Sequence, residues 1–338
     1  MGRGWLLFEV LGGRPVVVAQ HDKLRNFIPA AVFLQRNAYR DEITALIATA
    51  TRRRERVTHR SADGHKEIHA MPVVMTDGVV HGVQVWLGPR GASPPPRVVP
   101  GSIKWDLTTG LATDCPQALQ NAGKDLAVEP THGRTFASDM PIGVINPAET
   151  KVLALAIDRE PGSTFSGTWD LTGSGGEPVR AAFVSRVLNE PQPDNVDHRI
   201  CRAMNWRVAP NPTDRAPDDL AITLVLGTAR AGAHRALLDL NDWRILKWID
   251  TPSPDFDWQK HDLERPLIHP EDASVRQAMA TQWGDGAASG VLRLRNTLGG
   301  WTPIHIEIQK VEIKPGTVLG LASFRVAQGR GSQAHTDL

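Results

Sequence analysis

Apolar and polar positions alternate in short blocks along this chain, and the blocks follow the same order three times. Each pass starts with two apolar runs joined by a turn, continues through a helical stretch and ends with three strand-like runs. Helices that are segregated from strands in this way favour an antiparallel sheet covered on one face. We therefore predict an α+β fold of three similar domains in an elongated array, each with a twisted antiparallel sheet and a concave pocket between its sheet and its helices.

The first pass occupies residues 1–90 and predicts a hairpin, two helices and a three-stranded meander. Ile43, Leu46, Ile47 and Ala50 have the spacing of one helix face, which makes the second helix the stronger prediction. Asp63-Gly64 and Asp77-Gly78 are turn signals between the final strands. The expected elements are 5–11, 15–20, 27–34, 40–54, 57–60, 67–75 and 79–87.

The second and third passes are predicted at residues 101–209 and 210–327. A proline-rich stretch at 91–100 and another at 210–217 are typical of linkers, and the tail at 328–338 is expected to be disordered. The second pass predicts strands at 103–107, 111–113, 164–171, 179–188 and 199–208, with a helix from Asn146 to about Ile157. The third predicts a lead-in helix at 218–230 and strands at 236–240, 244–250, 291–296, 303–313 and 318–326.

An internal repeat links these two passes. Ile268-His-Pro-Glu-Asp272, which starts a predicted helix, matches Ile145-Asn-Pro-Ala-Glu149 at an offset of 123 residues. Proline suits the first helical position, and the acidic residues complement the helix dipole. Ser289-Gly290 matches Ser166-Gly167 at the same offset, and the passes close alike in Trp206-Arg-Val-Ala209 and Phe324-Arg-Val-Ala327. A repeat that spans helix, turn and strand indicates an array of like modules.

On these helix starts, the Gly-Gly turns at 175–176 and 299–300 and the alternating strands that follow, the chain resembles tandem PAS domains. The run Asp77–Leu87 resembles the end of a GAF domain, and the whole is similar to actinobacterial proteins built of three sensor domains in a PAS-GAF-PAS-like order. Which domain is PAS and which is GAF stays open. The resemblance implies a cytosolic signalling or ligand-sensing protein without chemistry of its own.

Composition narrows the functional class. The net charge of +1 over 338 residues gives no electrostatic reason to expect a nucleic-acid or anionic-lipid partner. No apolar run approaches the roughly 20 residues of a membrane helix. The two cysteines, Cys115 and Cys201, are far apart and fit a reducing, cytoplasmic compartment as packed thiols.

Four tryptophans are the candidate ligand-binding or interface residues, because an indole is amphipathic and can line a pocket. They are Trp169 in the second pass and Trp248, Trp258 and Trp301 in the third. Packing in the domain cores is the alternative interpretation for each of them.

Catalytic and metal sites are not predicted. His261, His269 and Asp272 belong to an acid–histidine cluster that is the one plausible seat for an enzyme, but a loop followed by a helix start explains it. His65 and His69 are four residues apart on a predicted strand, about 13 Å from each other, which argues against a zinc site. No kinase, cyclase or helix-turn-helix motif is recognisable, and no output domain is expected.

The sequence therefore predicts a non-enzymatic sensor that binds a small ligand, a protein partner or both. The alternatives are an enzyme with a site near His261–Asp272 and a structural part that pairs as a homodimer. The sequence names no cofactor.

Overall fold

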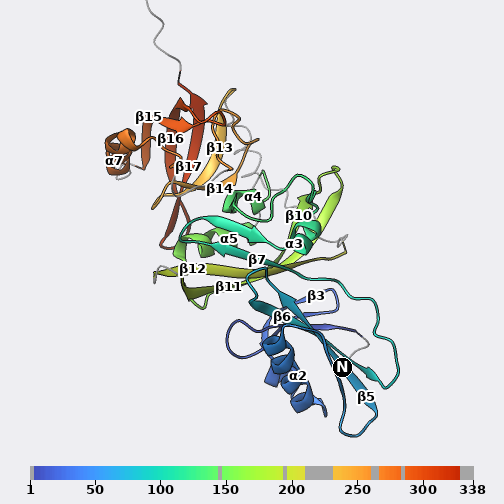
Figure 1. The fold of residues 1–338 in the computed structure, drawn as a ribbon. Helices are drawn as coiled ribbons and strands as arrows, with labels where there is room; N and C mark the ends of the chain where they lie inside the picture. Colours follow the sequence, from blue (N-terminus) through green and yellow to red (C-terminus); the bar gives the residue numbers. More distant parts are fainter. Residues whose placement is uncertain are drawn as a thin grey trace, which may run out of the picture. The chain divides into compact units, whose positions relative to one another are not determined.

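The structure, a computed structural model, describes residues 4–143, 147–192, 196–209, 231–259, 266–282 and 286–327. Three antiparallel sheets dominate this part of the chain, as predicted, and the helices beside them are few (Figure 1). Tertiary contacts divide the chain into two compact units, Met1–Arg134 with Pro147–Ala216, and Thr135–Asn146 with Pro217–Leu338. The predicted linker at 210–217, the lead-in helix at 218–230, His261 and the tail at 328–338 lie outside the described residues.

The N-terminal domain is a six-stranded sheet in the order β3-β2-β1-β6-β5-β4, with α2 packed against β5 and β6. Its elements are β1 (Leu6–Glu9), β2 (Val16–Gln20), β3 (Lys23–Pro29), α1 (Ala30–Phe33), α2 (Arg40–Arg53), β4 (Val57–Arg60), β5 (Lys66–Val74) and β6 (Val80–Pro89). The four apolar residues that predicted α2 are all buried in it. The prediction missed β3, because it interpreted the apolar residues from Phe27 onward as a helix.

The middle domain is also a six-stranded sheet, in the order β10-β11-β12-β7-β8-β9. Its elements are β7 (Gly101–Asp106), β8 (Leu111–Asp114), α3 (Pro116–Asn121), β9 (Arg134–Thr135), α5 (Pro147–Asp158), β10 (Thr164–Thr172), β11 (Pro178–Pro191) and β12 (Asp197–Arg207). Helix α3 contacts β7 and β12, and α5 contacts β10. Asn146, predicted to cap α5, lies outside the described residues.

The C-terminal domain is a five-stranded sheet in the order β14-β13-β17-β16-β15. Its elements are β13 (His234–Asp239), β14 (Arg244–Trp248), the short helix η1 (Pro270–Asp272), α7 (Ala273–Gln282), β15 (Ala287–Arg295), β16 (Trp301–Lys314) and β17 (Thr317–Val326). A segment from earlier in the chain completes this unit: α4 (Phe136–Asp139) contacts β14, and the Gly143 N–H donates to the Trp248 carbonyl at 3.1 Å.

The internal repeat is present in the sheets of the middle and C-terminal domains. The offset of 123 residues holds at both ends of two successive strands, from β10 to β15 and from β11 to β16. It holds in the pairing register as well, because Phe183 faces Gly167 in one sheet and Ile306 faces Gly290 in the other.

The predicted match between the closing strands, Trp206–Ala209 with Phe324–Ala327, is wrong by one residue. Phe183 pairs with Asn205, whereas Ile306, its counterpart, pairs with Phe324. Phe324 therefore corresponds to Asn205 and not to Trp206. Successive residues of a strand point to opposite faces, so Phe324 belongs to the core beneath α7 while Trp206 faces away from the helices of its own domain.

The N-terminal sheet is buried on both faces. Leu6 and Phe8 of β1 pack with α2, whereas Leu7 between them packs on the other face against Met204 and Trp206 of the middle domain. Each Å² of apolar surface that this contact removes from water contributes about 25 cal/mol, so the contact stabilises the protein. The N-terminal and middle domains therefore belong to one compact unit.

A buried polar cluster reinforces that contact. His81 of β6 donates from Nδ1 to the Ala203 carbonyl at 2.9 Å and accepts at Nε2 from Arg202 Nη1 at 3.1 Å. Arg202 also binds Glu190 and Asp77, with Nη2–oxygen distances of 2.7 and 2.9 Å. Burial lowers the pKa of His81 to about 4, so this imidazole is neutral at pH 7.

Candidate ligand-binding site

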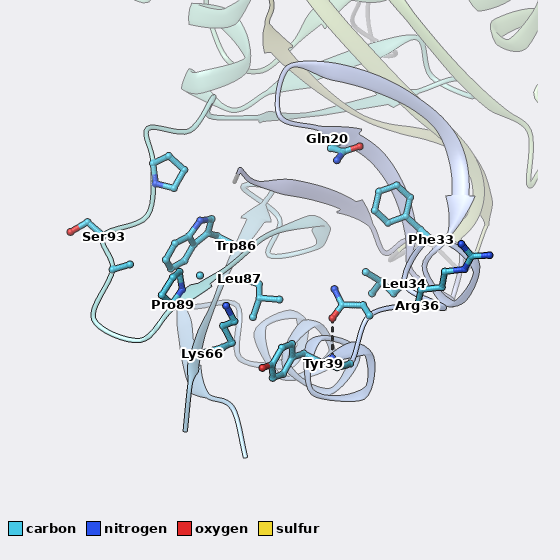
Figure 2. Close-up of a pocket in the computed structure, with 15 residues that line it drawn as sticks. Gln20, Phe33, Leu34, Arg36, Tyr39, Lys66, Trp86, Leu87, Pro89 and Ser93 are labelled. Carbon is cyan, nitrogen blue, oxygen red and sulfur yellow. Dashed lines mark hydrogen bonds between the residues drawn. The ribbon is translucent and has the colours of Figure 1, made fainter. Parts of the chain in front are cut away.

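A cavity of about 980 Å³ opens in the N-terminal domain, where β2 and β6 end. The loop between α1 and α2 forms one wall, and the stretch after β6 forms another (Figure 2). Three aromatic residues line it, Phe33, Tyr39 and Trp86, together with apolar residues such as Leu34 and Leu87. Ligand pockets commonly have this volume and this mainly apolar lining with a few polar groups.

Trp86 lies in the cavity wall because of the glycine two residues further along β6. The indole of Trp86 lies across the backbone of Gly88, so closely that a Cβ at Gly88 would be 2.0 Å from two of its ring carbons. On its other side the indole contacts the ring of His69, with 5.3 Å between ring centroids. Trp86 is only 4% exposed, which makes it a fixed part of the wall.

Hydrogen bonds hold the α1–α2 loop in place. The Asn37 side chain accepts from the Tyr39 N–H at 2.9 Å (Figure 2). The Asn37 carbonyl accepts from the Arg40 N–H at 3.1 Å. The Tyr39 hydroxyl donates to Asp63 at 2.7 Å. Hydrogen bonds, the largest effect from Ser61 and the next from Tyr39, lower the pKa of Asp63 to about 2. This carboxylate is therefore ionised, and it already has hydrogen-bond partners within the protein.

The linker after β6 is fastened to the sheet at two points. The Trp5 indole N–H donates to the Pro95 carbonyl at 2.9 Å, and the Gln84 amide donates to the Val98 carbonyl at 2.8 Å. Because Ala92, Ser93 and Pro95 line the cavity, the segment that leads into the middle domain is part of the site.

The charged residues of the lining are all cations. Arg36 and Lys66 line the cavity, and no aspartate or glutamate does. Neither cation forms an ion pair with any residue in the described part of the chain. The backbone of Lys66 is fixed by Ser61, whose hydroxyl accepts from the Lys66 N–H at 2.9 Å. The site therefore presents positive charge beside aromatic surface.

The four predicted tryptophans lie elsewhere. Trp169 is buried in the middle domain and stacks on Phe183, with 4.9 Å between ring centroids. Trp248 is buried in the C-terminal domain, and Trp258 meets it edge-on at 5.5 Å. Trp301 is 36% exposed. None of the four lines the cavity described above, and their role as ligand residues stays a prediction.

The alternative site at His261–Asp272 is described only in part, because His261 lies outside the described residues. Asp272 accepts from the Arg293 backbone N–H at 2.6 Å and from its guanidinium at 2.6 and 3.0 Å. These hydrogen bonds lower the pKa of Asp272. His269 accepts from the Glu271 N–H at 3.2 Å and meets the ring of Trp301 edge-on at 4.6 Å. These contacts join the start of the helix to β15, through Arg293, and to β16, through Trp301.

Sequence reasoning missed every residue of the cavity wall. Trp86 was within the run that resembles a GAF domain, and a tryptophan two residues before a glycine at a strand end was the available signal. Phe33 and Tyr39 carried none, because the local pattern around the short helix and the loop after it does not show which distant segments they face.

Within the described residues, no helix combines the length and apolar character needed to span a membrane.

Three family models match successive parts of the chain. They are Rv3651-like, N-terminal, over residues 4–96, Rv3651-like, middle domain, over 99–208, and Rv3651-like, C-terminal domain, over 218–333. A search of curated proteins finds no match to the chain.

Among solved structures, an uncharacterized protein from Mycobacterium tuberculosis is 43% identical over 96% of this chain and 97% of its own, with a TM-score of 0.89. A sensory box histidine kinase/response regulator from Burkholderia thailandensis is 18% identical over 38% of this chain and 88% of its own, with a TM-score of 0.22. An RNA-binding light-oxygen-voltage receptor is 10% identical over 67% of this chain and 94% of its own, with a TM-score of 0.24. On the three family models and the first of these structures, the chain belongs to the Rv3651-like family.

Proposed function

We propose that this protein is a non-enzymatic sensor that binds a small ligand in the cavity of its N-terminal domain. The observation that carries the proposal is the cavity itself, about 980 Å³ in volume and lined by three aromatic residues and two cations. Such a combination of apolar walls and a few polar groups supports binding of a small molecule.

The linker offers a route from the ligand to the rest of the chain. Pro95 lines the cavity and also accepts the hydrogen bond from Trp5, and the chain continues directly into β7 at Gly101. A ligand that contacts Pro95 more favourably in one linker conformation shifts the population toward that conformation. We assign the middle and C-terminal domains to the PAS/GAF class of sensor modules on the repeated helix start and strands, and the N-terminal domain on the run Asp77–Leu87. The cytoplasmic location, the protein partner and the homodimer stay predictions.

The contacts of Asp272 support the non-enzymatic part of the proposal. A general acid or base needs a pKa near the working pH and a free path to its substrate. The carboxylate of Asp272 instead has a lowered pKa and is occupied by Arg293. Asp272, the described carboxylate of this cluster, therefore has a structural role.

The test is a thermal-melt screen of a chemically diverse metabolite library, followed by titration calorimetry of each compound that binds. A ligand present at 100 times its Kd stabilises the protein by about 2.7 kcal/mol. At about 2–4 °C per kcal/mol for a compact unit of roughly 200 residues, this raises the Tm by about 5–11 °C. Trp86→Leu is expected to abolish binding, and circular dichroism verifies that this variant is folded. The matched control is Trp301→Leu, which removes a tryptophan that does not line the cavity.

Binding that survives Trp86→Leu in the folded variant would place the ligand outside this cavity. A screen in which no compound changes the melting curve, or turnover of any bound compound by the purified protein, would refute the proposal.

A further inference from the structure

We propose that the ligand of this cavity is a flat aromatic anion that carries a carboxylate or a phosphate group. This inference rests on the proposed function and specifies the class of molecule that the site selects. It is argued from the charge of the lining, from the occupancy of the neighbouring carboxylates and from the arrangement of the aromatic rings.

The lining carries two positive charges and no negative one. Arg36 and Lys66 both line the cavity, and neither has a carboxylate partner in the described part of the chain. Two cations in the lining without an acid disfavour a cationic ligand and favour an anionic one, although the Arg36 guanidinium lies at the outer edge of the cavity, beyond Phe33 (Figure 2).

Nearby carboxylates are engaged elsewhere and do not neutralise these cations. Asp63 accepts from the Tyr39 hydroxyl at 2.7 Å and from the His65 N–H at 3.0 Å. Glu42, in the first turn of α2, accepts from His59 at 2.8 Å and from the Ala62 N–H at 3.2 Å. The positive charge of Arg36 and Lys66 is therefore available to a ligand.

The aromatic residues specify a flat ring. The indole of Trp86 and the ring of Phe33 flank the cavity from two sides, and Tyr39 lies between them on the α1–α2 loop (Figure 2). Aromatic side chains favour stacked or edge-on contact with another ring. A volume of about 980 Å³ accommodates a molecule of two or three rings with its acidic group.

Matched pairs of compounds test the class, and two sources of the anion are separated. Indole-3-acetate and indole-3-acetamide differ in the carboxylate, and adenosine monophosphate and adenosine differ in the phosphate. In titrations of the full chain we expect the anion of at least one pair to bind 10-fold or more tightly than its neutral partner, and the difference to shrink as salt screens the charges. The pair that discriminates identifies carboxylate or phosphate as the group recognised.

Charge-removing variants connect the preference to the cavity. Lys66→Gln and Arg36→Gln are each expected to weaken binding of the anion by 10-fold or more while leaving the neutral partner within about 2-fold, since a 10-fold change corresponds to about 1.4 kcal/mol. Lys23→Gln is the matched control, because Lys23 is an exposed cation of the same domain outside the lining.

The outcomes separate this inference from the proposed function. If the cavity binds only neutral or cationic compounds of the wider library, or if anion binding is unchanged in both Gln variants, the aromatic-anion assignment is overturned and the sensor proposal stands. If neither the matched pairs nor any compound of the library binds, both are overturned.

Discussion

At the residue scale, Trp86 and Gly88 act as a pair. A strand residue normally holds its side chain perpendicular to the sheet, beside those of residues two positions away. With no Cβ at Gly88, the indole of Trp86 lies over the backbone of that residue and becomes part of the cavity wall. The shape of the site therefore depends on the absence of a side chain at Gly88.

Gly88→Ala tests this dependence. The added methyl group would be 2.0 Å from the indole of Trp86, so the ring must move, and we expect a loss of about 1–3 kcal/mol in the free energy of unfolding. Urea denaturation measures the loss, and titration with a bound compound measures the accompanying loss of affinity. Gly300→Ala is the control, because its nearest neighbour is the Asn296 side chain at 3.4 Å. Equal stability of the two variants would contradict the role given to Gly88.

The sequence could predict burial but not the site. Cys201 was expected to be a packed thiol, and it is fully buried, which raises the pKa of its thiol to about 12. A cavity wall, by contrast, combines residues from three separate segments, such as Phe33, Trp86 and Pro95. The local sequence pattern shows which side chains are apolar. Only the tertiary fold determines which of them surround a cavity.

At the scale of elements, the helix start at Ile268–Asp272 is fastened to the neighbouring strand. The sequence explained Asp272 through the helix dipole, whereas the structure adds hydrogen bonds from the backbone N–H and the guanidinium of Arg293 in β15. Next to it, the Ile268 backbone forms an isolated bridge with Leu294. One carboxylate thus joins the helix to the sheet.

Asp272→Asn is expected to lower the free energy of unfolding by about 1–2 kcal/mol, because it removes a charge-assisted contact. Arg293 lowers the folded-state pKa of Asp272, so this contribution is present above the unfolded pKa near 3.9 and is lost as the pH falls through the folded pKa. Urea denaturation at pH 7 measures the effect. Glu271→Gln is the control, because that side chain is 75% exposed and is 3.2 Å from the same guanidinium. A larger loss from Glu271→Gln than from Asp272→Asn would contradict this account.

Hydrophobic periodicity predicted most elements, but it failed where pairing with a neighbouring strand determines the structure. The spacing of Ile43, Leu46 and Ala50 predicted α2, because its buried stripe is local in sequence. Strand β3 was missed, because all seven of its residues are half-buried or exposed and do not alternate. The one-residue error at Phe324 has a similar origin: pairing with β16, and not similarity to Trp206, determines which face it occupies.

At the scale of the whole molecule, two sheets from different domains make one compact unit. Leu7 and Met204 represent the apolar part of the contact, and His81 with Arg202 represents the polar part. A buried neutral histidine that accepts from a guanidinium stabilises this arrangement only while it stays unprotonated.

Acid is therefore expected to weaken the contact. The folded-state pKa of His81 is lowered to about 4 by burial, against about 6.5 when unfolded. Below pH 6.5 the unfolded chain binds a proton that the folded chain does not, so stability falls between pH 6.5 and 4, by about 2 kcal/mol at pH 5. Nearby Asp77 and Lys104 also act on this imidazole, so the difference between wild type and His81→Gln is the measured quantity.

Urea denaturation at pH 7.5 and pH 5 is expected to show a smaller decrease for His81→Gln than for the wild type. His65→Gln, at an exposed histidine of the same domain, is expected to behave like the wild type. An identical decrease in all three proteins would refute the assignment.

The repeat also shows that two corresponding strands differ in the chemistry of one face. Ala182 and Val184, which contact the N-terminal domain, correspond at the 123-residue offset to His305 and Glu307. Those two side chains interact with Arg325 at 3.3 and 3.1 Å. If another chain applied its own N-terminal sheet to this surface, the charges would lose their water without new partners. The charged side chains on β16 therefore disfavour head-to-tail association of copies of the protein through the duplicated sheet surface.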